Sequence, residues 1–224
     1  MSAPATAVSG TGSPVIGVML VDDHMVVRIG FRMLLEATTD IRVVAEADSA
    51  DSAYQQIPVS HPDVIVMDIG LGETSGVEAT RRILARDKNA RVLALSSHED
   101  PSYVRFMLKA GALGYLSKRS APEELIQAIR QVAAGRMYLD AHVSQRMALQ
   151  EFNGEKNPLE ILSEREFGVF VMLAKGASVN QIAVTMNVSP RTTGTHLYNI
   201  KQKLGAANQA ELALIALRHG LIEL

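Results

Sequence analysis

Two patterns alternate over the first 135 residues. Short apolar runs, most of them rich in Val, Ile or Leu, predict buried strands, because a strand covered on both faces of its sheet is apolar along its whole length. These runs occupy residues 16–21, 42–47, 64–67, 92–95 and 114–116. Between them, apolar residues recur at helical spacing in residues 25–37, 50–57, 76–86, 101–110 and 122–134. This alternation predicts an α/β fold: a doubly wound five-stranded parallel sheet with helices on both faces.

The last third of the chain has only the helical pattern. Helices are predicted over residues 164–174, 179–186, 190–204 and 209–218. The second and third are joined by a short turn, Asn187-Val188-Ser189, which is helix-turn-helix spacing. We therefore expect a small all-α domain that contains a helix-turn-helix.

Capping residues support several of these helix starts. A Ser or Asp before a helix accepts hydrogen bonds from free backbone N–H groups, and a Glu or Gln three residues later can return the bond. The full spacing occurs at Ser120 with Glu123, Ser163 with Glu166, and Ser178 with Gln181, and prolines that favour the first helical position follow Asp100 and Ser189.

Breaks in the patterns divide the chain into segments. Residues 1–14 are rich in Ala, Ser, Thr and Gly without an apolar run, so we expect a disordered leader and not a secretory signal. Residues 15–134 make up the predicted α/β domain. Residues 135–158 hold helix breakers such as Gly154 and Pro158 and are predicted to be a linker with one short helix at 141–150. Residues 159–224 make up the helical domain.

Composition limits the functional classes. Hydrophobic residues are 47% of the chain and charged residues 21%, as in ordinary soluble domains, and no apolar stretch approaches the roughly 20 residues that span a bilayer. The absence of cysteine excludes disulfides and Cys-ligated zinc and favours a cytoplasmic location. The net charge is only −2, but Arg191, Lys201 and Lys203 give residues 189–203 a cationic face without acids.

Polar side chains directly follow four of the predicted strands. They are Asp22 and Asp23, then Asp68, Ser96 and Lys118. The carboxyl ends of parallel strands meet at one edge of an open sheet, where ligands bind, so we expect these residues to converge. Clustered carboxylates repel one another unless a hard cation such as Mg²⁺ relieves the repulsion through oxygen ligands. Such a site suits phosphoryl transfer to a carboxylate, with the lysine pairing with the phosphoryl group.

Residues 15–134 resemble a response-regulator receiver domain. The resemblance is carried by Val21-Asp22-Asp23-His24, Val66-Met67-Asp68, Ala94-Leu95-Ser96 and Gly114-Tyr115-Leu116-Ser117-Lys118. It implies a flavodoxin-like fold, phosphorylation of Asp68 by a histidine kinase, and a Mg²⁺ site of Asp22, Asp23, Asp68 and the backbone carbonyl of Gly70. It also implies a switch pair, in which the Ser96 hydroxyl moves to the phosphoryl group and the Tyr115 ring turns into the vacated space. The family usually has proline where this chain has Gly72.

Residues 162–221 resemble the LuxR-type helix-turn-helix of NarL/FixJ response regulators, and within them the GacA/UvrY branch. The resemblance is carried by Leu162-Ser163-Glu164-Arg165-Glu166, Gly176, Ile182-Ala183, Ser189-Pro190-Arg191-Thr192, His196, Ile200, Lys203-Leu204 and Glu211-Leu212. It implies promoter DNA as a partner, a homodimer on paired half-sites, and DNA contacts by Arg191, Thr192, Thr195, Lys201 and Lys203. Thr193 and Gly194 depart from the family's usual valine and lysine. We expect phosphorylation to free the recognition helix for sequence-specific binding and so to control transcription.

Two other functions fit parts of the pattern. A small-molecule phosphatase with Asp68 as nucleophile needs an acid two residues later to protonate the leaving group, and this chain has Gly70 there. We therefore do not expect an enzyme. A DNA binder that works without phosphorylation, using its first domain only for assembly, is the second alternative, and the altered loop after Asp68 is compatible with it.

Overall fold

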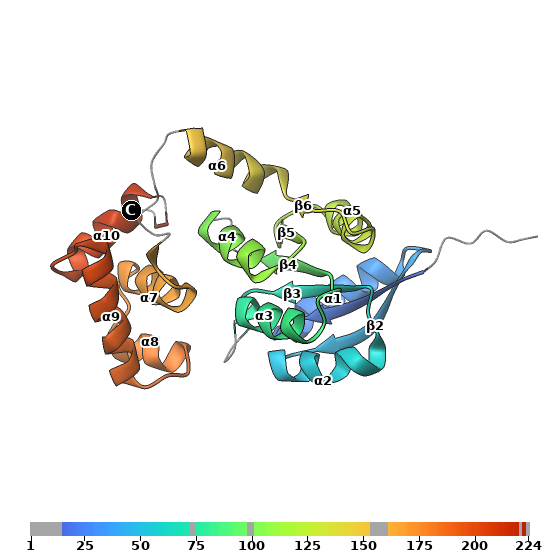
Figure 1. Ribbon diagram of the computed structural model, residues 1–224, viewed down its shortest axis with the longest axis horizontal. Coiled ribbons are helices and arrows are strands. Elements are labelled where there is room, and N and C mark those ends of the chain that lie inside the picture. Colours follow the sequence, from blue (N-terminus) through green and yellow to red (C-terminus); the bar gives the residue numbers. More distant parts are fainter. Residues whose placement is uncertain (1–14, 72–74, 98–100, 153–160, 220, 223–224) are drawn as a thin grey trace, which may run out of the picture.

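A computed structural model of the 224-residue chain describes residues 15–71, 75–97, 101–152, 161–219 and 221–222. The first part alternates strands and helices as predicted (Figure 1). Its elements are β1 (Ile16–Val21), α1 (Met25–Glu36), β2 (Ile41–Ala47), α2 (Ala50–Ser60), β3 (Val64–Asp68), α3 (Gly76–Arg86), β4 (Val92–Ser96), α4 (Pro101–Ala110), β5 (Gly114–Ser117) and α5 (Pro122–Ala133). A further strand and helix follow, β6 (Tyr138–Leu139) and α6 (Ala141–Phe152).

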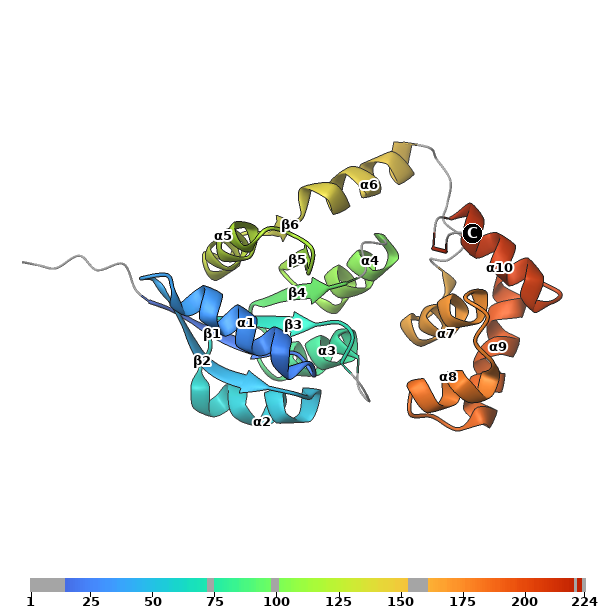
Figure 2. The same cartoon turned by 180° about the vertical axis from the view of Figure 1, so that it is seen from behind.

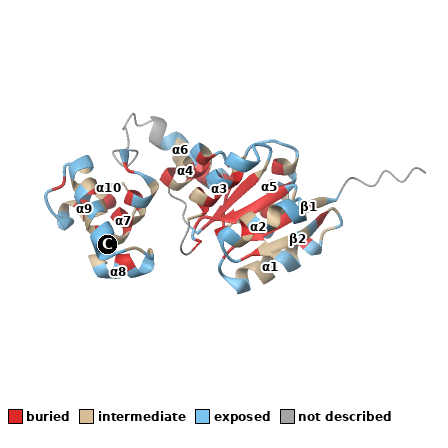
Figure 3. Ribbon diagram, turned by 60° about the horizontal axis from the view of Figure 1, so that its bottom comes forward, coloured by how far each residue is buried: buried red, intermediate tan, exposed pale blue. Residues whose placement is uncertain are grey.

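All strands run parallel in one sheet with the order β2-β1-β3-β4-β5-β6. Helices α2, α3 and α4 cover one face, and α1 and α5 cover the other (Figures 1 and 2). In Figure 3 the buried residues concentrate in the strands at the centre of the sheet, whereas the edge strand β2 is only partly buried. The doubly wound parallel sheet is thus confirmed, with one strand more than the five predicted.

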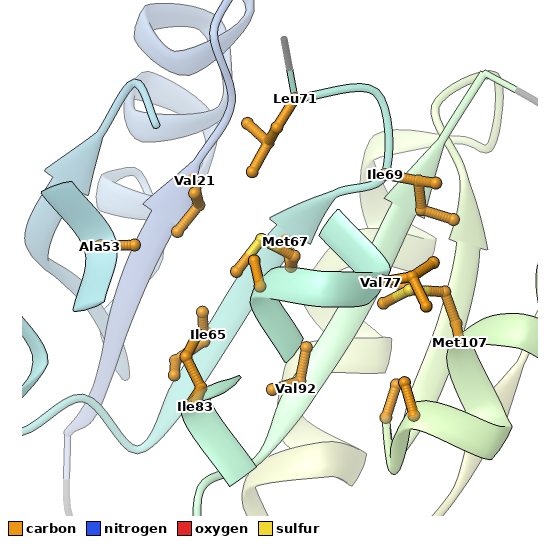
Figure 4. Close-up of a cluster of buried hydrophobic side chains, with 14 of the residues drawn as sticks. Val21, Ala53, Ile65, Met67, Ile69, Leu71, Val77, Ile83, Val92 and Met107 are labelled. Carbon is orange, nitrogen blue, oxygen red and sulfur yellow. The ribbon is translucent and has the colours of Figure 1, made fainter. Parts of the chain in front are cut away.

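The core beneath α2, α3 and α4 explains why the strands are apolar throughout. In Figure 4, Ile65 and Met67 of β3 meet side chains that come from α3 and α4, including Val77, Ile83 and Met107. Each of these five side chains is at most 2% exposed. Because α1 and α5 bury the opposite face equally well, neither face of the central strands tolerates a polar residue until the strand ends.

The second part is all helical. Its helices are α7 (Glu164–Ala174), α8 (Val179–Thr185), α9 (Pro190–Leu204) and α10 (Gln209–Arg218), and they bury a core of their own. The capping boxes predicted at Ser163 and Ser178 are both present, and the Ser189 side chain caps α9 ahead of Pro190. The predicted leader, 1–14, and the predicted cap at Asp100 lie outside the described residues.

Two local predictions are wrong. Helix α2 was predicted to end at residue 57 but continues through Pro58 to Ser60. Proline cannot donate to the carbonyl four residues earlier, but a guanidinium N–H of Arg86 donates to that oxygen, on Tyr54, at 3.5 Å. The box predicted at Ser120 does not form either, because Ala121 is the N-cap of α5 and the Ser120 hydroxyl donates to Asp140 at 2.5 Å.

The segment predicted as a linker, 135–158, begins with ordered structure. Strand β6 pairs with β5, and the buried Asp140 directly after it accepts hydrogen bonds from the backbone of His142 and Val143 at the start of α6. The sheet therefore extends beyond residue 134. No helix in the described part of the chain is long and apolar enough to cross a bilayer.

Gly76, at the start of α3, packs directly against the end of β3. A Cβ on Gly76 would lie 2.0 Å from the carbonyl oxygen of Asp68, far inside contact distance, whereas a Cβ on Gly30 in α1 would meet nothing within 4 Å. We expect Gly76→Ala to lower the free energy of unfolding by about 2–3 kcal/mol through overpacking. Gly30→Ala should raise it by about 0.5–1 kcal/mol by favouring the helix. Urea unfolding of both variants measures these changes in the free energy of unfolding. Equal changes in Gly76→Ala and Gly30→Ala would refute the packing argument.

Candidate functional site

The carboxyl edge of the sheet holds two buried acids. Asp68 is the last residue of β3 and Asp22 directly follows β1, and these residues are 3% and 4% exposed. Strands β1 and β3 are neighbours in register, with Val21 opposite Met67, so their ends place both side chains side by side. The core forces this placement, because the first position past each apolar strand is where a carboxylate can leave the core.

Lys118 holds the two acids together. It follows β5, and its backbone N–H donates to the carbonyl of Ser96 at the end of β4, at 2.7 Å. The ammonium group lies 2.6 Å from Asp22 Oδ2 and 2.9 Å from Asp68 Oδ2, with the side chain 15% exposed. The predicted meeting of Asp22, Asp68 and Lys118 at one sheet edge is therefore confirmed, over a sequence separation of 96 residues.

Burial and ion pairing have opposite effects on the pKa values of Asp68 and Lys118. Burial raises the pKa of Asp68 and the negative charge of Asp22 adds to the rise, while Lys118 opposes it. Burial alone would lower the pKa of Lys118, but its hydrogen bonds to Asp22 and Asp68 outweigh this and raise the pKa above its usual value. Lys118 thus stays charged, and its charge opposes the rise that burial causes in the pKa of Asp68.

The donor set at this edge fits a hard divalent cation. Ligand atoms of Asp22, Asp23, His24 and Asp68 all lie within 4.8 Å of one another. Three of the four are carboxylates, the ligands that Mg²⁺ prefers. The Asp22 carboxylate is pre-oriented, because Oδ1 accepts the backbone N–H of His24 at 2.8 Å. The backbone N–H of Gly70 donates to Asp68 Oδ1 at 3.2 Å, so the loop after β3 also lies close to the acids.

The two residues of the expected switch are both buried. Ser96 ends β4 beside Asp68's strand and is 1% exposed, and the Tyr115 ring is fully buried in the core on the α4 side of the sheet. The burial of both residues fits a shared site at the strand ends, and their role as a switch pair stays a prediction.

Helices α8 and α9 form the predicted helix-turn-helix. The turn between them needs a left-handed residue, and Asn187 has φ 49°, a conformation that asparagine tolerates better than most residues. Arg191, Thr192 and Thr195 are exposed on the first turns of α9, where a helix of this kind meets DNA bases. A Cβ on Gly194 would meet nothing within 4 Å, so packing within the chain does not require glycine there.

The two lysines near the end of α9 differ in their hydrogen-bond partners. Lys201 donates to the carbonyl of Ala207 at 2.9 Å just past the helix end. Lys203 donates at 2.6 Å to Glu166, the buried acid of the α7 capping box. Hydrogen bonds with Lys203 and Ser163 outweigh the effect of burial and lower the pKa of Glu166. Lys203 therefore has a structural partner within the helical domain that spacing did not indicate.

Sequence reasoning missed Tyr198, which is 64% exposed in the middle of α9. It shares an exposed face with Arg191, Thr195 and Gln202. These positions are spaced by four, three and four residues, the spacing of one helix face, so a search for exposed periodicity would have found them.

The two parts of the chain contact each other through α4 and α7 (Figures 1 and 2). The rings of Tyr103 and Phe106 on α4 both make edge-to-face contacts with the ring of Phe167, at centroid distances of 5.1 and 5.7 Å. Ser75, the N-cap of α3, donates a hydrogen bond to Glu164 at the start of α7. Burial raises the pKa of that glutamate.

A cavity of about 320 Å³ lies in this interface. Its walls include Ile69, Gly70 and Leu71, directly after Asp68, and Arg165 and Met172 of α7. Residues 69–71 thus face the helical domain. Helix α9, the second helix of the helix-turn-helix, is not the covered element, contrary to expectation, because the first domain contacts α7 and leaves the start of α9 exposed.

Known proteins share this order of two domains. The family model described as "Response regulator receiver domain" matches residues 18–130, and that described as "Bacterial regulatory proteins, luxR family" matches residues 160–216. The response regulator UvrY of Escherichia coli K12 is 38% identical over 208 residues, which cover 92% of this chain and 95% of UvrY. The chain belongs to the two-component response regulators.

Two further proteins are similar to this response regulator, one in sequence and one in fold. GacA of Pseudomonas syringae is 36% identical over 210 residues, covering 93% of this chain and 98% of GacA, so the resemblance to the GacA/UvrY branch is confirmed. RcsB of Salmonella enterica, solved on the promoter rprA with the phosphomimetic BeF3⁻, has a TM-score of 0.66 at 22% identity and covers 90% of this chain and 98% of RcsB. A related structure contains two RcsB dimers on two parallel DNAs.

The Lys203–Glu166 pair should stabilise the helical domain. In Lys203→Gln the buried carboxylate loses its cation, so we expect the local unfolding free energy of α7 and α9 to fall by about 1–2 kcal/mol at pH 7, a value reduced for the partial exposure of Lys203. Lys201→Gln should cost less than about 0.5 kcal/mol. Amide hydrogen exchange of the full chain measures both.

The pH dependence of this effect has a definite sign. The native pKa of Glu166 is lowered, so the pair contributes stability above the unfolded value of about 4.3 and loses it as pH falls through the lower native pKa. The difference between the native chain and Lys203→Gln should shrink below about pH 4. A difference that stays constant from neutral to acidic pH would contradict the charged pair.

Proposed function

We propose that phosphorylation of Asp68 by a sensor histidine kinase controls sequence-specific DNA binding, and hence transcription, by this response regulator. The observation that carries the proposal is the Lys118 ammonium held 2.9 Å from a buried carboxylate at the end of a strand. A carboxylate in this setting can act as a nucleophile toward phosphorus, and a fixed cation beside it can receive the charge of the phosphoryl group.

The acids are the residues that would hold Mg²⁺: the side chains of Asp22, Asp23 and Asp68, with the carbonyl of Gly70. The bound ion would neutralise charge on the transferring phosphoryl group and align it with the carboxylate. An Asp68 oxygen then forms a bond to phosphorus while the P–N bond to the kinase histidine breaks, leaving an acyl phosphate. Lys118 exchanges its contact with the Asp68 carboxylate for one with a phosphoryl oxygen.

Two sets of contacts connect the phosphorylation site to the helical domain. The Ser96 hydroxyl donates to the phosphoryl group, and the buried Tyr115 ring packs on the side of α4, which carries Tyr103 and Phe106. The loop after Asp68 leads to Ser75 and its bond with Glu164. Both sets of contacts end at α7, so phosphorylation shifts the equilibrium between docked and separated helical domains.

Separated helical domains bind DNA as pairs. Arg191, Thr192 and Thr195 would meet base edges or phosphates, with Lys201 and Lys203 adding positive charge near the backbone. Tyr198, on the same exposed face of α9 as Arg191 and Thr195, would lie against the same DNA groove as those residues. A two-fold arrangement of two copies matches paired half-sites on DNA, and the dimers of RcsB on DNA support this arrangement by analogy.

One observation favours a second function, DNA binding without phosphorylation. The first-turn residues of α9 are already exposed in the docked arrangement, so the receiver does not cover the recognition surface. In that case the docked domains would bind DNA singly, and phosphorylation would change only their pairing.

Replacing the acceptor separates these functions. Asp68→Asn removes the nucleophilic oxygen pair, so we expect no phosphate incorporation from acetyl phosphate and loss of promoter occupancy across the genome under inducing conditions. Undiminished incorporation would contradict the assignment of Asp68. Full occupancy by the Asp68→Asn protein would instead favour the phosphorylation-independent function.

Loosening the interface should mimic the signal. Phe106→Ala removes one ring contact to Phe167 without touching the acids, so we expect separated domains and DNA binding that depends less on phosphorylation. Small-angle scattering and DNA affinity of the unphosphorylated protein measure this. Val26→Ala, at an exposed position of α1, is the control and should change neither. An unchanged radius of gyration in Phe106→Ala would contradict the role of this contact.

A further inference from the structure

Arg28 lies beneath the turn that carries the first two acids. It stands in the first turns of α1 with its side chain 15% exposed. One guanidinium N–H donates to the main-chain oxygen of Asp22 at 2.6 Å. This is a charge-assisted hydrogen bond to the backbone of a residue whose carboxylate already belongs to the acidic site.

Glu46 of β2 pairs with the guanidinium by charge, without a hydrogen bond to Arg28 Nε. Its carboxylate lies 3.5 Å from Arg28 Nε and 2.9 Å from Arg32 Nη1, and it is 25% exposed. Arg28 therefore links three elements: the helix that bears it, the neighbouring strand and the β1–α1 turn. Arg32 shares the same acid from a more exposed position, 46% exposed, and so offers a matched comparison.

Other contacts at this turn act on side chains or on other backbone groups. The Asp22 carboxylate accepts the N–H of His24, the His24 ring nitrogen lies 2.7 Å from Asp23 Oδ1, and the backbone N–H of Asp22 donates to Ala47 at 3.1 Å. The bond from Arg28 acts on the Asp22 carbonyl itself, so it restrains the peptide plane between Asp22 and Asp23. Rotation of that plane would swing the Asp23 side chain away from Asp22 and Asp68.

We infer that Arg28 is a positioning residue for the metal-binding acids, holding the β1–α1 turn so that Asp22 and Asp23 present their carboxylates together. The inference rests on the proposed function, since it concerns the same cation site. Residues that orient metal ligands without touching the metal typically contribute 10- to 100-fold to metal affinity. Arg28 acts in this way through the backbone of one ligand residue.

The test measures binding of Mn²⁺ alone to the unphosphorylated full chain by the loss of the free-ion electron paramagnetic resonance signal. We expect Arg28→Gln to weaken Mn²⁺ binding by about tenfold or more. Arg32→Gln, which also loses an ion pair with Glu46, should stay within about twofold of the native chain. Urea unfolding of both variants compares their effects on stability.

Conservative variants keep the test decisive if Arg28→Gln does not fold. Arg28→Lys retains the charge beside Glu46 but not the planar fork that reaches the Asp22 carbonyl. It should therefore weaken Mn²⁺ binding several-fold while Arg32→Lys does not. Native-like Mn²⁺ affinity in a folded Arg28 variant, or equal losses in the Arg28 and Arg32 variants, would overturn the inference. A native chain that binds no Mn²⁺ would overturn the metal site of the proposed function instead.

Discussion

The Lys118 ammonium lies between carboxylates that come from two other strands, and much of the first domain follows from that contact. Asp22 and Asp68 can be buried together only because a cation 2.6 and 2.9 Å away offsets their repulsion. The lysine reaches them only because β5 lies two strands from β3, across β4, and its own N–H is bonded to the end of β4. The contact between Lys118 and the two acids therefore depends on both the strand order and the register of the sheet. A phosphoryl group on Asp68 that paired with Lys118 would change the contacts at the ends of β1, β3 and β5 together.

The outer parts of the structure extend this edge toward the helical domain. Residues 69–71 face α7, α4 carries the two rings that meet Phe167, and β6 adds a strand from which α6 departs. The site and the DNA-binding unit are thus joined by short, packed contacts and not by the chain alone. Because the covered element is α7, the proposed control through this interface would change how the helical domain is held, while the exposed face at the start of α9 stays in solvent.

Much of this could be predicted from the sequence, for physical reasons. Apolar runs located the central strands, and the polar residues that follow them located Asp22, Asp68, Ser96 and Lys118, because strand ends are where a doubly covered sheet admits charge. Capping boxes located the starts of α7 and α8. Contacts between residues far apart in the sequence could not be predicted in the same way, because they depend on tertiary packing. Arg86 donates to the carbonyl of Tyr54 that Pro58 leaves without a backbone donor. Ser120 donates to Asp140 and does not cap α5, and Lys203 pairs with Glu166. Local patterns carry no information about such partners.

The central claim is that one buried carboxylate of this edge accepts phosphate. Borohydride reduction after exposure to a small phosphoryl donor converts an aspartyl phosphate into homoserine, which mass spectrometry of peptides can locate. The account predicts conversion at Asp68, dependent on Mg²⁺. Conversion at Asp22 or Asp23 in place of Asp68, or none in folded protein with Mg²⁺ present, would contradict it.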